Sequence, residues 1–362
     1  YELAVVGAGI CGLAHAWIAA REGRRVVVFE RDQTAIGASI RNFGMIWPIG
    51  QAPGAAYEMA MSSRTLWCEL AEAAGFSLSE CGSLHLAHRD DEWDVLQEFA
   101  AQASTLGYDA TLLTAEEVLR RTSAANPAGL LGGLWSPTEL CVDPRQALAS
   151  VPQYLQQECQ VDIHFSTAIR AVDGTTLETI EGKTCRADEV VVATGADFRT
   201  LFPAEFTNSG LRPCKLQMLR TKRQPDHRLG PHLASGLTQR HYANFASCAS
   251  LPRLKQRVAE ETPELDRYGI HVMAAQNGVG EIVLGDSHEY GDQITPFDRE
   301  EITRLMLREL RALIELPDWE LSSLWHGVYA IQSSGEPLFV HEPAEGVMIA
   351  IATGGCGMTM SF

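Results

Sequence analysis

The first twelve residues carry the feature that most constrains the fold, a glycine turn between a strand and a helix. Residues 3–6 form an apolar run of strand length and lead directly into Gly7-x-Gly9-x-x-Gly12. After this motif the apolar residues follow the spacing of an amphipathic helix. A second apolar strand at residues 26–29 ends in Glu30. This order predicts a doubly wound α/β unit at the start of the chain.

The glycines of this turn have separate physical roles. Gly7 permits a sharp turn, Gly9 lets the backbone approach a pyrophosphate, and Gly12 lets the helix pack close to the sheet. The N-terminus of the helix offers N–H groups and a positive dipole end to the phosphates. Glu30 is placed to accept a hydrogen bond from a ribose 2′-OH, and its carboxylate repels a 2′-phosphate. The pattern predicts dinucleotide binding, and the alternative is a turn that serves only close packing.

Length and charge narrow the classes of protein that fit. A chain of 362 residues is long enough for two domains with separate cores. The net charge of −17 disfavours nucleic acid and anionic membranes as partners. No apolar run reaches the roughly 18 residues that a membrane-spanning helix needs. Nine cysteines without a C-x-x-C pair predict reduced thiols and a cytoplasmic location, and the sequence opens on the first strand without a signal peptide.

Periodicity and turn residues predict the remaining elements. Helices are expected at residues 56–74, 90–106 and 298–315, with a short capped helix after Thr114. Strands are expected at residues 83–87, 161–165, 168–172, 176–180, 183–186, 189–192, 212–221 and 346–352, and as a hairpin at 269–273 and 281–285. Residues 130–144 are expected to be strand and loop, and residues 231–267 to be irregular, forming either a substrate-covering loop or a surface excursion.

Nucleotide-binding signals at the start, near residue 195 and at the end of the chain predict a discontinuous cofactor domain. We assign residues 1–80, 145–215 and 325–362 to a Rossmann-like domain of the α/β class. Residues 81–144 and 216–324 are assigned to a substrate domain with a mainly antiparallel sheet and flanking helices.

Four segments in this order resemble the D-amino-acid oxidase, glycine oxidase and sarcosine oxidase family of FAD enzymes. They are the glycine motif with Glu30, the loop at residues 39–45, the turn at residues 193–195 (Ala-Thr-Gly) and the terminal loop at residues 354–359 (Gly-Gly-Cys-Gly-Met-Thr). The resemblance covers essentially the whole chain. The first motif does not separate FAD from NAD, but the turn and the terminal loop favour FAD and argue against an NAD-dependent dehydrogenase.

The resemblance implies that FAD lies extended, with its adenosine near Glu30 and its pyrophosphate at Gly9 to Gly12. The terminal loop, opening a helix, would direct backbone N–H groups at the flavin edge that gains negative charge on reduction. The residues implied for FAD are Gly7, Gly9, Ile10, Cys11, Gly12, Glu30, Arg31, Ser39, Asn42, Phe43, Gly44, Met45, Ile169, Ala193, Thr194, Gly195, Gly354, Gly355, Gly357, Met358 and Thr359.

The chain departs from the family pattern at three places. Sarcosine-oxidase-like members attach flavin to a cysteine two residues before a tyrosine; here the tyrosine is Tyr329, but Gly327 stands at the cysteine position, which predicts non-covalent FAD. The arginine that clamps a carboxylate in glycine oxidases is absent from residues 326–330. The lysine that assists the reaction with oxygen in sarcosine oxidases is absent too, with Val283 near its place. The chain could therefore be an oxidase or a dehydrogenase, and its electron acceptor is O2 or another molecule.

Residues 38–48 look most like a subgroup linked to aminophosphonate breakdown. The expected reaction is FAD-dependent oxidation of a C–N bond, with hydride transfer to flavin N5 and hydrolysis of the imine. The expected substrate is an aminoalkylphosphonate or an N-methylated amine. The alternatives are a glycine or D-amino-acid oxidase and a non-catalytic flavin subunit of an amine dehydrogenase complex; the net charge disfavours a flavoprotein of tRNA modification.

The substrate-side candidates are three residues from two segments, Tyr329, His326 and Arg41. Lys215 and Arg240 are further candidate cations for an anionic substrate group. His271 and His288 are expected to be structural. No metal site is predicted, since His85 and His88 lie three apart on a strand and face opposite sides.

Overall fold

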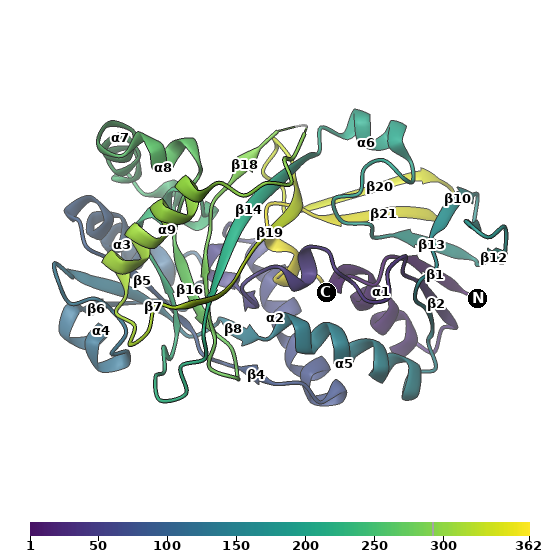
Figure 1. Cartoon of the computed structure of the whole chain (residues 1–362), viewed down its shortest axis with the longest axis horizontal. Coiled ribbons are helices and arrows are strands. Elements are labelled where there is room, and N and C mark those ends of the chain that lie inside the picture. The colour runs from purple at the N-terminus through teal and green to yellow at the C-terminus, as the bar shows by residue number, and fades with distance from the viewer. Residues whose placement is uncertain (292) are drawn as a thin grey trace.

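Two large sheets form the framework of the protein (Figure 1). The computed structural model describes residues 1–291 and 293–362. A six-stranded sheet lies on the right of Figure 1, beside the N-terminus, and a nine-stranded sheet lies on the left. β14 (Arg212–Thr221) and β19 (Leu321–Ile331) pair antiparallel along their length between the two.

The six-stranded sheet is parallel except at one edge. Its order is β20-β21-β13-β1-β2-β9, and only β20 pairs antiparallel with its neighbour. Its strands are β1 (Leu3–Val6), β2 (Val26–Phe29), β9 (Asp162–His164), β13 (Glu189–Val192), β20 (Leu338–Ala344) and β21 (Val347–Ala352). β1, at the centre, is buried at all four residues, as a strand covered on both faces must be.

Alternation along β1 assigns each face of this sheet to a different layer. Leu3 and Val5 pack in one core with three helices, α1 (Ile10–Arg21), α2 (Ala55–Ala74) and α5 (Pro144–Gln157). Ala4 and Val6 pack in a second core beneath a small antiparallel sheet of β10 (Ile169–Asp173), β11 (Thr176–Thr179) and β12 (Thr184–Arg186). The result is a three-layer unit of helices, parallel sheet and antiparallel meander.

The nine-stranded sheet is mixed and mainly antiparallel, with β15 and β5 as its parallel pair. Besides β14 and β19 it contains β5 (Ser83–Ala87), β6 (Thr111–Thr114), β7 (Gly132–Ser136), β15 (His232–Ala234), β16 (Met273–Gln276), β17 (Ile282–Gly285) and β18 (Glu289–Tyr290). Its helices are α3 (Asp90–Ala103), α4 (Ala115–Arg121), α7 (Leu251–Glu261), α8 (Pro263–Arg267) and α9 (Glu300–Leu313). A third sheet joins β3 (Met45–Ile46), β4 (Leu78–Ser79) and β8 (Leu140–Val142), and α6 (Pro203–Ser209) precedes β14.

The predicted fold class is confirmed, and several segments differ from the predicted elements, among them β19, β20 and α6, for which no strand or helix was predicted. Residues 144–157 form α5, which the sequence analysis missed, and residues 231–267 are not irregular, because they contain β15, α7 and α8. The domain boundaries stay a prediction; those at 215/216 and 324/325 fall inside the paired strands β14 and β19. Within the described ranges all nine cysteines are free, and no helix there is long and apolar enough to cross a bilayer.

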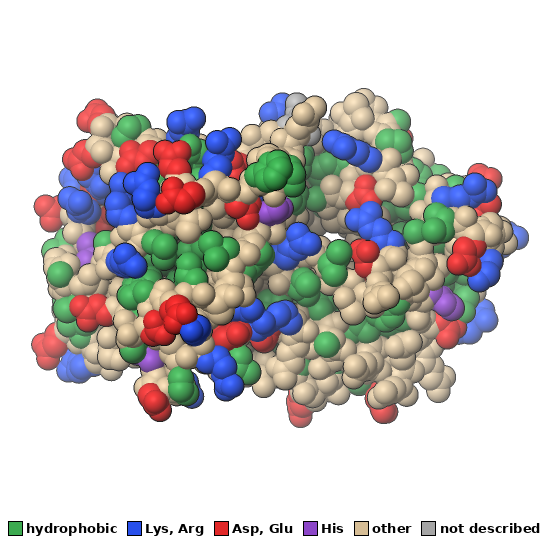
Figure 2. All heavy atoms as spheres, in the orientation of Figure 1, with side chains coloured by type: hydrophobic (Ala, Val, Ile, Leu, Met, Phe, Trp, Pro, Cys, Tyr) green, Lys and Arg blue, Asp and Glu red, His purple; other side chains and the backbone are tan. Residues whose placement is uncertain are grey.

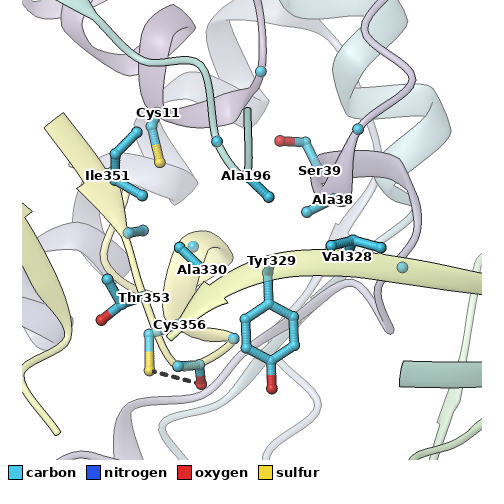
Figure 3. Close-up of a pocket in the computed structure, with 18 of the residues that line it drawn as sticks. Cys11, Ala38, Ser39, Ala196, Val328, Tyr329, Ala330, Ile351, Thr353 and Cys356 are labelled. Atoms are coloured by element: carbon cyan, nitrogen blue, oxygen red, sulfur yellow. Dashed lines mark hydrogen bonds between the residues drawn. The ribbon is translucent and has the colours of Figure 1, made fainter. Parts of the chain in front are cut away.

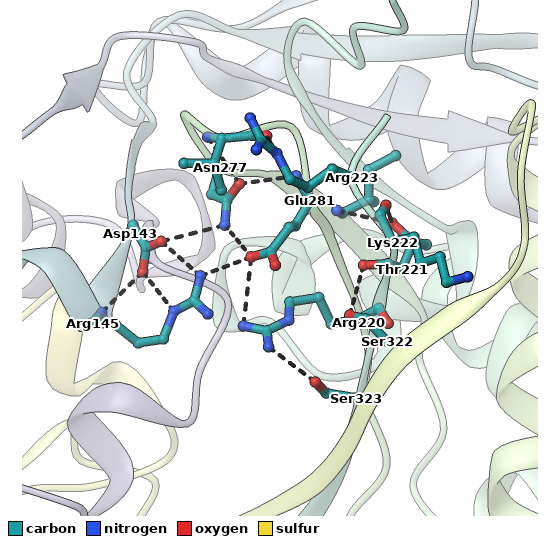
Figure 4. A network of polar contacts seen from close by, with 12 residues as sticks. Asp143, Arg145, Arg220, Thr221, Lys222, Arg223, Asn277, Glu281, Ser322 and Ser323 are labelled. Carbon is teal, nitrogen blue, oxygen red and sulfur yellow. Dashed lines mark hydrogen bonds and ion pairs between the residues drawn. The ribbon is translucent and has the colours of Figure 1, made fainter. Parts of the chain in front are cut away.

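A partly buried polar network ties the start of α5 to the nine-stranded sheet (Figure 4). The Glu281 carboxylate accepts hydrogen bonds from Arg145 Nη2 at 2.8 Å and Asn277 Nδ2 at 3.0 Å, and its Oε2 lies 3.5 Å from Arg220 Nη1. Arg145 also donates to Asp143, the N-cap of α5. Burial alone would raise the pKa of Glu281, but the hydrogen bonds from Arg145 and Asn277 hold that pKa below its usual range. The network therefore fixes α5 against the sheet.

Replacing Glu281 by alanine is expected to lower the free energy of unfolding by about 1–3 kcal/mol, since it leaves two arginines without their shared acceptor. Urea unfolding followed by circular dichroism measures this loss. The control is Glu116→Ala, which removes an exposed partner of Arg120 and should change the free energy by less than about 0.5 kcal/mol. Equal losses in the two variants would contradict a structural role for the network.

Candidate active site

A cavity of about 1730 Å³ runs from the edge of the six-stranded sheet to the face of the nine-stranded sheet. Segments from both parts line it, and the space-filling view shows the molecule hollowed between its two halves (Figure 2). A volume of this size exceeds that of ordinary small-molecule pockets and suits an extended dinucleotide together with a second ligand.

The glycine turn has the geometry that pyrophosphate binding requires. Gly7 has a φ of +106°, and a Cβ on Gly12 would lie 1.9 Å from the Gly7 carbonyl oxygen. Helix α1 therefore begins directly against the turn, with Gly9 as its N-cap, and the Ile10 N–H at its start donates to Ser39 Oγ at 3.0 Å. Its N-terminus opens on the cavity, where it is suited to a phosphate.

Glu30 lies at the end of β2 and is 8% exposed, at the edge of the same cavity. One of its oxygens accepts a hydrogen bond from the Ala8 N–H at 2.9 Å and the other from the Asp32 N–H at 3.0 Å. These bonds fix the carboxylate and still leave lone pairs for a ribose hydroxyl. Arg31 faces the cavity beside it and pairs with Asp197 at 2.5 Å.

The chain end closes the other side of the cavity (Figure 3). Gly354 and Gly355 both have positive φ. Where the sequence analysis expected a helix to begin, residues 356–358 form a single 3₁₀ turn. The Met358 carbonyl accepts a hydrogen bond from Trp67 Nε1 at 2.7 Å, which anchors the loop to α2. β19 crosses in front of this loop, with Val328, Tyr329 and Ala330 along the cavity.

The residues assigned to FAD from the sequence converge on this one cavity. All of them line it except Gly12 and Gly44. Both exceptions support it from behind: Gly12 packs under the Gly7 carbonyl, and a Cβ on Gly44 would lie 2.0 Å from the Val142 carbonyl oxygen. The backbone thus leaves room for a cofactor, and the residues present fit FAD. Their individual contacts with FAD stay a prediction.

Two of the three substrate-side candidates line the cavity, Tyr329 and Arg41. Burial raises the pKa of Tyr329 well above its usual value, so the phenol keeps its proton. Arg41 lies against β19: its Nη1 is 3.4 Å from the His326 carbonyl oxygen, and its own carbonyl accepts from Trp325 Nε1 at 3.1 Å. Among the described residues no carboxylate pairs with Arg41, so its charge is available to a ligand.

The other proposed cations and His326 are used elsewhere, which corrects the sequence-based assignments. His326 does not line the cavity, and its Nδ1 pairs with Asp298 at 2.8 Å. Lys215 is fully buried; its Nζ pairs with the same Asp298 at 2.8 Å and donates to backbone carbonyls. Arg240 pairs with Asp266 and also stays outside the cavity.

A cluster of histidines around one carboxylate was missed from the sequence. His241, His271 and His288 line the cavity together with Asp286, and the His271 ring centroid lies 4.2 Å from that of His241 and 4.8 Å from that of His288. Burial, followed by the neighbouring histidines, lowers the pKa of His271 well below its usual value. Burial raises the pKa of Asp286 to about 6. His271 comes just before β16, and Asp286 and His288 come just after β17, so the pairing of these two strands brings the three residues together.

Comparisons with known proteins agree with this geometry. Residues 2–362 match the family DAO, described as FAD dependent oxidoreductase. Glycine oxidase of Geobacillus kaustophilus is 27% identical over 212 residues, and glycine oxidase of Bacillus licheniformis 24% over 213 residues. These matches cover 54% and 56% of this chain and 55% and 56% of the relatives, so the chain spans about half the length of the curated relatives it matches.

Solved structures share the fold over the whole chain. Glycine oxidase from Geobacillus kaustophilus superposes with a TM-score of 0.79 at 21% identity, covering 100% of this chain and 91% of that one. L-proline dehydrogenase from P. horikoshii gives 0.76 at 21%, covering 99% and 90%. Iminodiacetate oxidase from Chelativorans sp. BNC1 gives 0.73 at 18%, covering 99% and 92%.

The fold and the cavity define an α/β protein with a site for an extended dinucleotide. The match over residues 2–362 places the chain in the DAO family of FAD-dependent oxidoreductases, and FAD is its cofactor.

Proposed function

We propose that this chain oxidises the C–N bond of a small amine, most closely an aminoalkylphosphonate or N-methylated amine. The observation that carries the proposal is the single cavity that joins the dinucleotide end at Glu30 to Tyr329 and Arg41. Curated relatives named glycine oxidase support amine chemistry. The loop at residues 38–48 supports the aminophosphonate subgroup.

FAD, when bound, supplies the hydride acceptor, so the protein contributes position and polarity. The Arg41 guanidinium is a fork of donors suited to a phosphonate or carboxylate oxygen. The Tyr329 hydroxyl, protonated at neutral pH, donates a hydrogen bond and carries no charge. Buried apolar residues around them, such as Met218, exclude water from the reacting C–H.

Attachment of FAD through a thiol is disfavoured by the residues at hand. Gly327 offers no nucleophile on β19. Cys11 and Cys356 line the cavity, but burial raises the pKa of both thiols, that of Cys11 to about 11. Because the thiolate is the reactive species, burial disfavours attack by either cysteine. The free cysteines also support a reducing, cytoplasmic location.

Anaerobic reduction of the holoprotein by a panel of amines tests the substrate. The panel holds glycine, sarcosine, D-alanine, 2-aminoethylphosphonate and its N-methyl derivative, and flavin bleaching is followed by absorbance. We expect the phosphonates to bleach the flavin faster than the carboxylates. Bleaching by glycine or D-alanine alone would overturn the phosphonate assignment and favour a glycine or D-amino-acid oxidase. A holoprotein that none of the amines reduces would favour a non-catalytic flavin subunit.

A further inference from the structure

The strand hairpin of the nine-stranded sheet carries three potential metal ligands at its cavity end. His271 precedes β16, and Asp286 and His288 follow β17. Met273 on β16 lies opposite Gly285 on β17, so the chain brings these three residues together just beyond the paired strands. They are 4%, 7% and 8% exposed, and they line the cavity described above.

The donor atoms converge on the Asp286 carboxylate. His271 Nδ1 lies 3.5 Å from Asp286 Oδ1, and His288 Nε2 lies 4.0 Å from Asp286 Oδ2. One ligand atom from each residue falls within 4.8 Å of the others. Metal–ligand bonds of about 2.0–2.1 Å place neighbouring donors about 3.3 Å apart in a tetrahedral site. A metal ion therefore fits after these separations shorten by up to about 1.5 Å.

Hydrogen bonding directs the lone pairs inward. His288 Nδ1 lies 2.9 Å from the Gly269 carbonyl oxygen, which accepts only, so this nitrogen carries a proton. The other ring nitrogen, Nε2, faces the Asp286 carboxylate. A histidine held by a backbone carbonyl in this way has the tautomer and orientation of a metal ligand.

Two of the inward atoms lack a partner. His271 Nδ1 and Asp286 Oδ1 are buried and make no hydrogen bond among the described residues. A buried carboxylate facing electron pairs is costly unless a cation balances it. The Asp286 carboxylate also repels an anionic ligand at this point. The cluster is therefore suited to a cation.

We propose that His271, Asp286 and His288 bind a divalent transition-metal ion of the zinc or iron(II) class. Two imidazoles and one carboxylate suit these ions, whereas magnesium and calcium prefer oxygen ligands alone. Three protein ligands leave at least one coordination position open to the cavity. The site stands on these three residues and does not depend on which amine the enzyme oxidises.

Metal content of the holoprotein tests the site without any assay of activity. The protein is treated with a chelator, desalted, and titrated with ZnCl₂ in a calorimeter, and bound metal is then counted after a second desalting. We expect one Zn²⁺ per chain. Asp286→Asn, which keeps the shape and removes the charge, should weaken binding at least about 10-fold, the lower end of the loss expected when a supporting group of a metal site is removed.

The matched control is His341→Gln, because His341 also pairs with a carboxylate, Glu205, but lies outside the cavity. This variant should bind zinc as the wild type does. The Asp286→Asn protein is folded if it keeps its flavin colour and, in the presence of chelator, unfolds at the same temperature as the wild type. If this variant does not fold, His288→Gln tests the same set of ligands. Absence of stoichiometric zinc, or equal binding by wild type and both cluster variants, would overturn the proposal and leave the cluster as a proton-sharing group.

Discussion

Replacing Gly12 by alanine is expected to weaken FAD binding by about 10- to 100-fold. This loss of affinity corresponds to the roughly 1–3 kcal/mol that an added methyl group costs in a tightly packed position. The added Cβ would lie 1.9 Å from the Gly7 carbonyl oxygen and 3.2 Å from Val5 Cγ1. The start of α1 must then move away from β1, and the helix end that faces the phosphates moves with it. Fluorescence titration of the apoprotein with FAD measures the loss.

Gly278→Ala is the matched control for this experiment. Gly278 lies outside the cavity, and a Cβ there would meet its nearest neighbour at 4.0 Å. Its affinity for FAD should equal that of the wild type. Circular dichroism checks that the Gly12 variant is folded. A folded Gly12→Ala protein with unchanged affinity for FAD would show that the close contact of helix and turn is not what builds the site.

Replacing Arg41 by methionine is expected to raise the concentration of an anionic substrate for half-maximal flavin reduction by about 10- to 100-fold. This is the range for removing a hydrogen bond to a charged group. Among the described residues Arg41 has no carboxylate partner, so its loss leaves no buried acid unpaired. The limiting rate of reduction should change much less, since the reacting C–H lies away from the anionic group. Anaerobic stopped-flow absorbance separates the two quantities.

The control for Arg41 is Arg170→Met, which removes an exposed arginine that pairs with Glu178 on the outer meander. It should leave both quantities unchanged. A second check uses an amine without an anionic group, for which wild type and Arg41→Met should differ little. Equal losses with charged and uncharged amines would contradict the role of Arg41 as the anion partner.

Local signals predicted most of the fold because each acts within a few residues. The apolar run before Gly7, the capping box at Thr114 and the left-handed Gly75 after α2 each correspond to an element boundary in the structure. Helix α5 was missed although Asp143 caps it and Pro144 occupies its first turn, because those residues were interpreted as a loop. Scattered Pro and His residues at 231–267 concealed α7 in the same way.

The site was predictable where one segment carries it and not where packing assembles it. The glycine turn and the terminal loop are contiguous, and both line the cavity. Lys215 and Arg240 could be recognised only as cations, because their partners Asp298 and Asp266 are distant or on another element. His271 lies 15 residues before Asp286, and only the register of β16 on β17 brings the two together, so no local pattern marks the cluster.

The measurement that tests the central claim most directly is the visible spectrum of the purified protein before and after acid precipitation. The protein is first incubated with FAD and desalted, so that only bound flavin remains. We predict one flavin per chain, with all of the yellow colour in the supernatant after precipitation, because Gly327 offers no thiol on β19 and burial disfavours the thiolates of Cys11 and Cys356. A colourless desalted protein would contradict the flavin site, and flavin that stays in the pellet would contradict non-covalent binding.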